Sequence, residues 1–551
     1  MKHYILYTIA LTSLTIPVMG QETYESANIA TQDLNGTARY IGMGGAMEAL
    51  GADISTISSN PAAIGLFRNS SINMTLGATG VSGDSKNASD VLNMKNNKMP
   101  VSFDQFGYVY SHETSNGNFL NFAINYHESR NFNQILSAES KLNAASQNKP
   151  LFHKTDGYAR NFNESTSSQN DLLYFNSLSR EDGNQDDVFY NDAEHFYFSQ
   201  NTKGYIGNYN FNLSGNHNDR IYWGFTFGIH NVNYSHSQTY SEDLVEYDNQ
   251  NIARPAGVVS VVDERKIKGT GYDIKGGIIF RPIDANPLRI GLYISTSTWY
   301  ELTSSNYTEL YNEAYTTNDH NEEIPIGRIN FLYNKDVANC SQEYDYKLFT
   351  PWKFGASIGH TIGTNIALGA TYEYSDYSTL DNRNITSRIY YDYYDYSKTE
   401  SESDETMNRH TEGTLKGVST FKLGAEYRPI PELAIRAGYN YVSPMYDSKG
   451  SRTGLPGNSN FRTYDSDGYY NSSTTDYTNW KETNRFTLGV GFNIDNFNID
   501  VAYMHSTQKG DFYPFETIKK MSNDDSNIAP SVEVNNTRNQ FLITLGYKFY
   551  P

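Results

Sequence analysis

The chain has 551 residues, of which 38% are hydrophobic, 14% aromatic and 19% charged. The aromatic content argues against disorder, and no apolar run of about 20 residues follows the N-terminus, which excludes a helical membrane protein. A net charge of -19 disfavours nucleic-acid binding, and the single cysteine, Cys340, excludes an intrachain disulfide and a thiolate zinc site. We expect no cofactor and no metal site.

Residues 1–20 have the pattern of a signal peptide. Lys2 and His3 form a short basic head, and residues 4–18 form an apolar core too short for a membrane span. Small residues precede a cleavage position after Gly20, which would make Gln21 the first residue of an exported protein. The alternative is a buried N-terminal strand.

Residues 21–70 are rich in Gly and Ala, and apolar residues are interspersed among them. Small residues allow backbone segments to pack closely, and a large polar barrel has room for a plug of about fifty residues. Asn60 followed by Pro61 indicates a helix cap with proline at the first helical position. We therefore predict a helical or irregular hatch here, with a disordered periplasmic tail as the alternative.

From residue 71 onward, apolar and polar residues alternate with a period of two. Between Asn484 and Ile494, for example, Phe486, Leu488 and Phe492 share one face of a strand. About fourteen segments follow this pattern: 71–80, 101–112, 119–130, 204–215, 220–240, 265–281, 288–301, 344–362, 365–378, 413–429, 433–443, 484–494, 497–508 and 537–550.

The joins between these segments alternate between short and long. The long ones are 81–100, 131–203, 241–264, 302–343, 379–412, 444–483 and 509–536. Short periplasmic turns and long outer loops are typical of outer-membrane barrels. With charges such as Lys422 and Glu426 opposite the apolar face, the pattern predicts an all-β, transmembrane antiparallel barrel of about 14 strands over 71–551. The alternative is a soluble β-sandwich, which gives no reason for this sorting of loops.

Three motifs resemble catalytic, ligand-binding or metal-binding motifs. Ser357 lies in a G-x-S-x-G pattern, but within an alternating strand rather than at the strand-to-helix turn that a nucleophile elbow needs. The tyrosine-rich run 390–396 is interpreted as a solvent-exposed outer loop, and the alternative is a ligand-binding platform. Four loop carboxylates could hold calcium: Asp465, Asp467, Asp524 and Asp525. Their spacing matches no EF-hand.

The stretch 37–46, TARYIGMGGA, together with Ala52-Asp53 and the stretch 60–65, NPAAIG, resembles the hatch of the FadL-type outer-membrane transporters of hydrophobic compounds. The segments 421–429 and 433–439, and then 488–492 and 499–504, resemble that family's late strand pairs. The resemblance implies a fourteen-stranded barrel with a lumenal hatch, positioned by Gly42, Gly44, Gly45, Asn60 and Pro61. Inward Arg436 and Lys422 are candidate partners for a ligand carboxylate, with lumen salt bridges as the other interpretation.

Two features depart from the family. The third strand, 119–130, contains no Gly or Pro to mark the kink of the family's lateral gate, and the loop 131–203 is polar. We expect a monomeric, non-enzymatic channel in the outer membrane of a Gram-negative cell, taking up hydrophobic small molecules such as long-chain fatty acids. Its other partners would be membrane lipid, lipopolysaccharide and the barrel-assembly machinery. The alternatives are a porin or surface ligand-binding barrel, and a barrel enzyme such as a lipase.

Overall fold

The computed structural model describes residues 22–85, 101–114, 117–150, 179–181, 188–190, 192–247, 252–317, 323–325, 337–391, 396–452, 474–517 and 527–549. The predicted signal peptide, 1–20, and the four candidate calcium carboxylates lie outside these residues. Among the helices that are described, none has the length and apolar character needed to cross a membrane.

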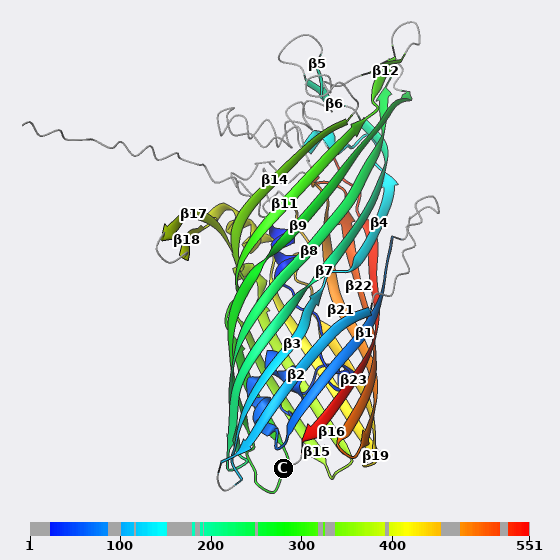
Figure 1. The fold of residues 1–551 in the computed structure, drawn as a ribbon. Helices are drawn as coiled ribbons and strands as arrows, with labels where there is room; N and C mark the ends of the chain where they lie inside the picture. Colours follow the sequence, from blue (N-terminus) through cyan, green and yellow to red (C-terminus); the bar gives the residue numbers. More distant parts are fainter. Residues whose placement is uncertain are drawn as a thin grey trace, which may run out of the picture.

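The chain forms a closed antiparallel barrel with fourteen strand positions, as the alternation of apolar and polar residues predicts (Figure 1). The wall consists of β1 (Ser70–Ser85), β2 (Val101–Glu113), β3 (Phe119–Asn131), β4 (Gln134–Lys141), β7 (Asp192–His217), β8 (Ile221–Tyr247), β9 (Ala253–Phe280), β10 (Arg289–Ser295), β11 (Trp299–Asn312), β14 (Val337–Phe349), β15 (Lys353–Ile362), β16 (Ile366–Asp376), β19 (Gly417–Ile430), β20 (Leu433–Val442), β21 (Tyr477–Ile494), β22 (Phe497–Tyr513) and β23 (Val532–Phe549). Pairing of β1 with β23 closes the barrel.

Three wall positions hold a broken strand. β3 and β4 both pair with β7, and β10 and β11 both pair with β9. On the other side, β15 pairs with β10, and β14 pairs with β11. The predicted strands 288–301 and 344–362 are therefore each divided in two.

An apolar belt surrounds the end of the barrel that has the short turns. In β21 the side chains of Phe486 and Leu488 are 58% and 61% exposed, whereas Thr487 between them is 2% exposed. Such a belt around a polar interior suits lipid outside and polar contacts inside. The structure thus confirms the predicted orientation of the two faces and the location in the outer membrane.

The predicted extent of the outer loops is wrong in several places, because strands continue where loops were expected. β9 has 28 residues, roughly 90 Å of strand, whereas a membrane span needs about ten. β8 and β9 thus occupy most of 241–264, and β11 and β14 occupy both ends of the predicted loop 302–343. Two small hairpins lie beyond them, β5 (Ser179–Glu181) with β6 (Val188–Tyr190) and β12 (Tyr315–Thr317) with β13 (Glu323–Pro325).

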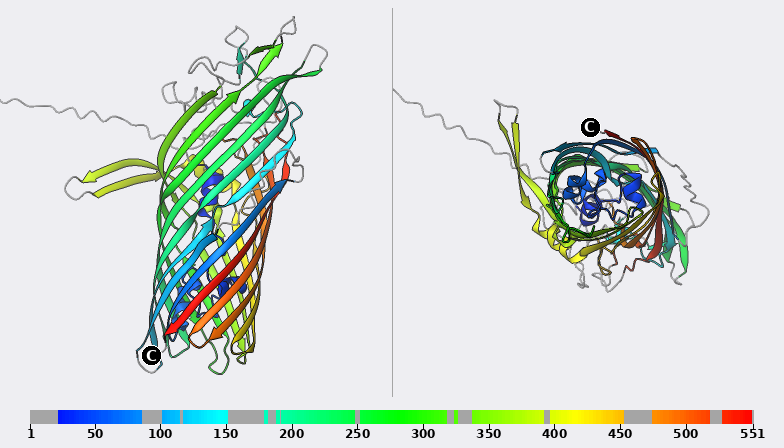
Figure 2. Two further views of the ribbon diagram at one scale, coloured as in Figure 1. Left: turned by 45° about the vertical axis from the view of Figure 1, so that its right-hand side comes forward. Right: turned by 90° about the horizontal axis from the view of Figure 1, so that it is seen from below.

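The predicted loop 379–412 is also largely ordered. β17 (Asp381–Tyr391) and β18 (Tyr396–Ser403) form a hairpin that projects sideways from the barrel (Figures 1 and 2). We call this hairpin the arm, and its tip carries the tyrosine run, of which 392–395 lie outside the described residues. The short turn η5 (Tyr377–Thr379) precedes the arm, and α5 (Glu405–Thr414) follows it.

Residues 22–69 lie inside the lumen (Figure 2, right). They form α1 (Thr23–Ala30), α2 (Ala38–Gly42), η1 (Ile54–Ser58) and η2 (Pro61–Leu66). Each of these helices begins at a polar capping residue. At the start of α2, for example, the side chain of Thr37 accepts a hydrogen bond from the backbone amide of Tyr40. The disordered-tail alternative is therefore wrong. Apolar clusters hold the hatch to the wall, one around Ile41 and Met47 and another around Ile54 and Ile64.

Candidate functional site

The predicted hatch glycines lie where the hatch backbone touches the barrel wall. Gly44 and Gly45 have φ angles of 62° and 78°, in the left-handed region that favours glycine. A Cβ added at Gly44 would lie 2.8 Å from both the carbonyl oxygen of Leu423 in β19 and the amide nitrogen of Tyr439 in β20. The backbone of the hatch can approach the wall this closely only without a side chain.

Glycines of the wall complete this contact. Gly42 of the hatch lies against Gly489 of β21, where an added Cβ would be 3.1 Å from the Cα of that residue. The other wall glycines at which an added Cβ would meet hatch atoms are Gly107, Gly224, Gly277, Gly291, Gly359, Gly369, Gly424 and Gly438. The small inward residues of these strands thus leave space for the hatch.

Asn60 and Pro61 form the cap that their order in the sequence predicts. The Asn60 side chain is fully buried, accepts from the amide of Ala62 at 3.1 Å and donates to the carbonyl of Glu48 at 3.1 Å. Pro61 is the first residue of η2, and its carbonyl meets Gly224 of β8. Both residues therefore fix the lower hatch against β8 and β9.

Lys422 ties the wall to the hatch through ion pairs. Its Nζ lies 2.9 Å from Glu48 of the hatch and 2.9 Å from Glu373 of β16. Glu48 is fully buried and also accepts from Thr371 at 2.7 Å and from the hydroxyl of Tyr40 at 3.0 Å. A buried ion needs such partners, because desolvation alone is costly.

Arg436 lies in a second ion-pair cluster beneath the hatch. Its guanidinium lies 2.6 Å from Glu426 and 2.6 Å from Asp500. Glu426 also receives Arg39 of the hatch at 3.4 Å. The structure thus places both predicted ligand-binding cations in ion pairs that bridge strands or hold the hatch.

A cavity of about 340 Å³ lies between the hatch and the extracellular half of the wall. We call it the chamber. Its lining mixes hydrogen-bonding groups with the aromatic side chains of Tyr24, Tyr40, Phe132, Tyr234, Tyr374, Tyr377, Tyr446, Tyr477 and Trp480. Aromatic faces beside polar groups can bind an apolar body and a polar group together.

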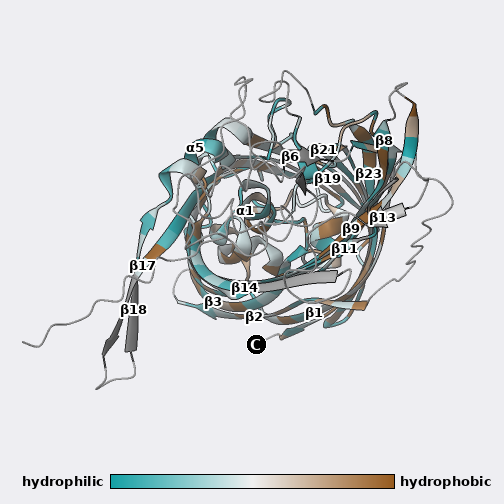
Figure 3. Cartoon of the chain, turned by 90° about the horizontal axis from the view of Figure 1, so that it is seen from above, coloured by the Kyte–Doolittle hydropathy of each residue, from teal (hydrophilic) through white to brown (hydrophobic). Residues whose placement is uncertain are grey.

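α1 lies within the barrel when it is seen from above (Figure 3), and its side chains line the chamber. The ring of Tyr24 stacks on Tyr446, with centroids 5.0 Å apart and planes inclined by 10°. Thr23 is 2.7 Å from Nδ1 of His410 in α5, and Glu25 pairs with Arg265 of β9. The first hatch helix is therefore bonded to the outer part of the barrel.

The third strand is broken at Phe132 and Asn133, although no Gly or Pro marks the position. An amide of Asn133 donates to the side chain of Asn131 at 3.0 Å, a local bond that bends the chain. Pairing with β2 ends at His127, so among the described residues the edge of β3 beyond it has no partner strand on that side. The break thus lies just beyond the predicted strand 119–130, and asparagines rather than Gly or Pro mark it.

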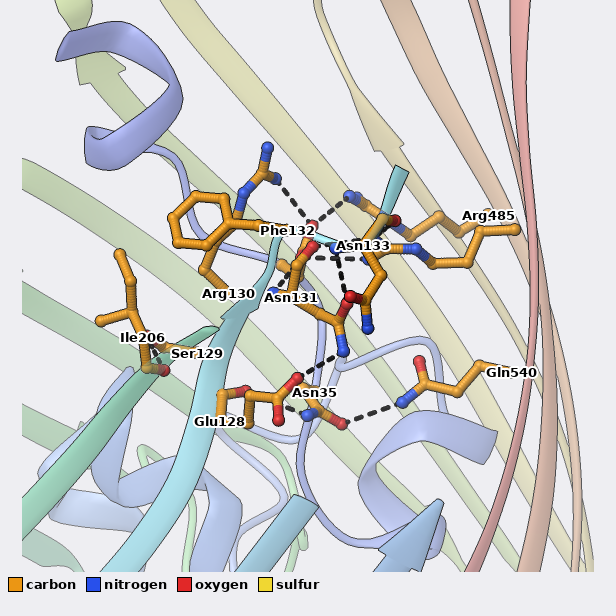
Figure 4. Close-up of polar contacts among 12 residues, drawn as sticks. Asn35, Glu128, Ser129, Arg130, Asn131, Phe132, Asn133, Ile206, Arg485 and Gln540 are labelled. Carbon is orange, nitrogen blue, oxygen red and sulfur yellow. Dashed lines mark hydrogen bonds and ion pairs between the residues drawn. The ribbon is translucent and has the colours of Figure 1, made fainter. Parts of the chain in front are cut away.

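The hatch bonds that unpaired edge in place of a strand (Figure 4). The amide of Asp33 donates to the carbonyl of Ser129 at 2.8 Å, and the Asp33 carboxylate accepts from the amide of Asn131 at 3.0 Å. Asn35 donates to the carbonyl of Glu128 at 2.9 Å. Hatch position and the wall at β3 are thus coupled by direct bonds.

Three arginines surround the Asp33 carboxylate. Arg130 lies at 2.9 Å, Arg538 of β23 at 3.1 Å and Arg485 of β21 at 3.9 Å. Burial alone would raise the pKa of Asp33, but the three guanidinium groups hold the pKa of that carboxyl well below its usual value. All four residues line the chamber.

Ser357 lies in a regular strand of the wall. It lies within β15, and its hydroxyl approaches the carbonyl of Gly291 at 3.4 Å. The strand-to-helix turn of a nucleophile elbow is absent at this position.

Asp33, Asn35, Arg130 and Arg538 were not singled out by the sequence analysis. The polar residues Asp33 and Asn35, on either side of Leu34 in a Gly- and Ala-rich segment, were one available sign. The pair Asn131 and Asn133 was another, because asparagine favours bends as glycine does.

No family model matches the chain, and no curated protein matches it. Solved structures match in fold. A Pseudomonas aeruginosa FadL homologue has 13% identity and a TM-score of 0.50, over 94% of this chain and 99% of that one. The CymD monoaromatic hydrocarbon channel has 11% identity and a TM-score of 0.45, over 94% and 98%. The Ralstonia pickettii toluene transporter TbuX has 13% identity and a TM-score of 0.44, over 94% of this chain and 100% of that one. The likeness to the FadL homologue confirms the predicted fold.

Proposed function

We propose that the protein is an outer-membrane channel that takes up hydrophobic small molecules such as long-chain fatty acids. One observation carries the proposal: the hatch that fills the lumen also bonds the unpaired edge of β3, and the chamber touches both. A molecule in the chamber contacts the two elements whose movement would let it pass, past the hatch or sideways through the wall.

The energetics suit a cargo with an apolar body. Each CH₂ group moved from water into the chamber contributes about 0.8 kcal/mol, and the aromatic lining offers surfaces for it. The fold shared with the FadL homologue supports the same proposal. Membrane lipid, lipopolysaccharide and the barrel-assembly machinery are the partners expected of such a barrel, which we propose acts as a monomer without a cofactor or enzymatic activity.

The test is uptake of labelled oleate by liposomes that contain a quencher or binding protein inside. Vesicles with the protein should take up oleate faster than empty vesicles, and a hatch variant should change the rate. Uptake equal to that of empty vesicles for a correctly folded barrel would contradict the proposal.

A surface-binding barrel is the second candidate, favoured by the strands that extend beyond the apolar belt and by the arm. Ile385 pairs with Ser401, so replacing 386–400 by Asn-Gly would shorten the arm and keep the pairing of Asn384 with Tyr346 of β14. The channel proposal expects unchanged oleate uptake from this variant. Loss of cell or ligand adhesion with unchanged uptake would instead assign a binding function to the arm.

A further inference from the structure

We propose that the outer faces of β7 and β9 carry a binding site for the phosphate groups of lipopolysaccharide. The site consists of Lys203 of β7 and of Lys266 and Lys268 of β9, which together we call the lysine patch. The inference names a surface for one partner of the proposed function. It rests on that partner and on the location in the outer membrane, and it does not depend on the uptake of a solute.

The lysine patch begins where the apolar belt ends. On β9 the outward side chains of Ile278, Ile274 and Tyr272 are exposed, and Lys268 and Lys266 follow on the same face. Lys268 lies about 13 Å beyond Tyr272 along the strand, which is about 10 Å in height at the usual strand tilt. A lysine side chain can reach back toward the belt, so its ammonium group lies at the level of the lipid headgroups.

The neighbouring strands extend the patch around the wall (Figure 1). On β7, Lys203 is exposed and lies two residues beyond the exposed ring of Tyr205. Lys203 is in register with Ser235 of β8, which is in register with Lys266 of β9. The two lysines are thus two strand spacings apart, about 10 Å. Between them β8 presents the uncharged side chains of Ser235 and Asn233, so the ammonium groups can approach a phosphate from both sides.

The lysines of the patch lack the carboxylate partners that other exposed lysines have. Lys481 lies 2.9 Å from Asp511, and Lys509 lies 3.6 Å from Glu533. Within the part of the chain that the structure describes, no carboxylate lies within 4.0 Å of the three ammonium groups of the patch. These cations are therefore available to an anion from outside the protein.

Carboxylates on the same face are bonded elsewhere or lie farther from the membrane. Glu343 and Asp345 of β14 accept from the hydroxyl groups of Ser305 and Thr303 of β11. Glu264 is exposed and lies beyond the patch on β9. A chain with a net charge of -19 is repelled by an anionic membrane surface as a whole. The patch is thus a local surplus of positive charge at the height where lipid phosphates lie.

The chemistry of lipopolysaccharide fits the patch and the belt together. Acyl chains pack against the apolar belt, and lysine binds phosphate as a compact point charge. A phospholipid carries one phosphate group, whereas lipid A, the membrane anchor of lipopolysaccharide, carries two. Three lysines on both sides of β8 offer enough cations for two phosphate groups, so we assign the patch to lipid A.

The experiment titrates the whole protein in detergent with lipid A that carries both phosphate groups, and separately with lipid A that has lost them. Native mass spectrometry measures the bound lipid. The wild type should bind the phosphorylated form more tightly. Lys266→Gln with Lys268→Gln should weaken that form about fivefold for each lysine, roughly 30-fold together, and leave the other form unchanged. Lys203→Gln alone should weaken the phosphorylated form about fivefold.

Two further variants distinguish the patch from an effect of net charge. Lys481→Gln with Lys509→Gln removes two positive charges from lysines that have carboxylate partners, and should not change the ratio of the two affinities. Asn233→Glu keeps every lysine but adds a carboxylate on β8 in register with Lys268, and should remove the preference for phosphate. Gel mobility before and after heating verifies that each variant has a closed barrel.

Equal affinities of the wild type for the two forms of lipid A would overturn the lysine patch. An equal loss of preference in the control pair would overturn it as well, and so would tighter binding of phosphatidylglycerol than of lipid A. The double variant of Lys266 and Lys268 should take up oleate as the wild type does in vesicles without lipopolysaccharide. Phosphate-selective binding by a wild type that takes up no oleate would leave the patch standing and contradict the proposed transport.

Discussion

Replacing Gly44 by Leu should displace the hatch while the barrel stays closed. The added Cβ would lie 2.8 Å from the carbonyl oxygen of Leu423 and 3.0 Å from that of Tyr439. Both are wall atoms fixed by the pairing of β19 with β20, so the hatch must move. A side chain at positive φ costs about 1–2 kcal/mol and overpacking about 1–3 kcal/mol. The sum, roughly 2–5 kcal/mol, raises the displaced population about 30-fold to several-thousand-fold.

Release of a small dye from vesicles measures this displacement, and retention of a bound fatty acid should fall at the same time. Gly363 provides the matched control, because its φ is 61° while an added Cβ would meet no atom within 4 Å. Gly363→Leu therefore imposes the backbone strain without the clash and should not leak. A folded Gly44→Leu barrel with wild-type leak and retention would refute the contact between hatch and wall.

Three further outcomes are expected. Lys422→Met leaves Glu48 and Glu373 without their cation and should weaken hatch docking by about 3–5 kcal/mol, which faster hydrogen exchange of the hatch would show. Adding Glu48→Gln should restore part of the protection from exchange. Slow exchange in the single variant would contradict the ion-pair link between the hatch and the wall. Asp33 has a lowered pKa in the folded protein, so the stability it contributes is complete above its unfolded pKa of about 3.9 and is lost only as the pH falls below that value. Protection of the hatch amides from hydrogen exchange should therefore be equal at pH 7.5 and pH 5. Loss of this protection between the two pH values would argue against the arginine cluster. Ser357→Ala should leave oleate uptake unchanged, whereas a loss with an intact barrel would revive an enzymatic role.

The sequence by itself determined the barrel. A strand has a period of two, so alternation such as Phe486-Thr487-Leu488 shows both the strand and its two faces. Local chemistry also determined the cap at Asn60, since the cap and the proline that follows it are neighbours in the chain. The ends of β8, β9 and β11 did not follow the same pattern, because their apolar residues, such as Leu244, Val261 and Leu310, are buried, whereas those nearer the short turns are exposed.

Only the tertiary structure decided the site. Asp33 meets Arg538 across 505 positions of the chain, and no spacing in the sequence predicts such a contact. Lys422 and Arg436 were visible as inward charges, but their partners, Glu48 and Asp500, come from the hatch and from another strand. Barrel closure brings these groups together, and burial then requires each charge to find a partner. The fold of the lumen therefore decided which cations hold the hatch.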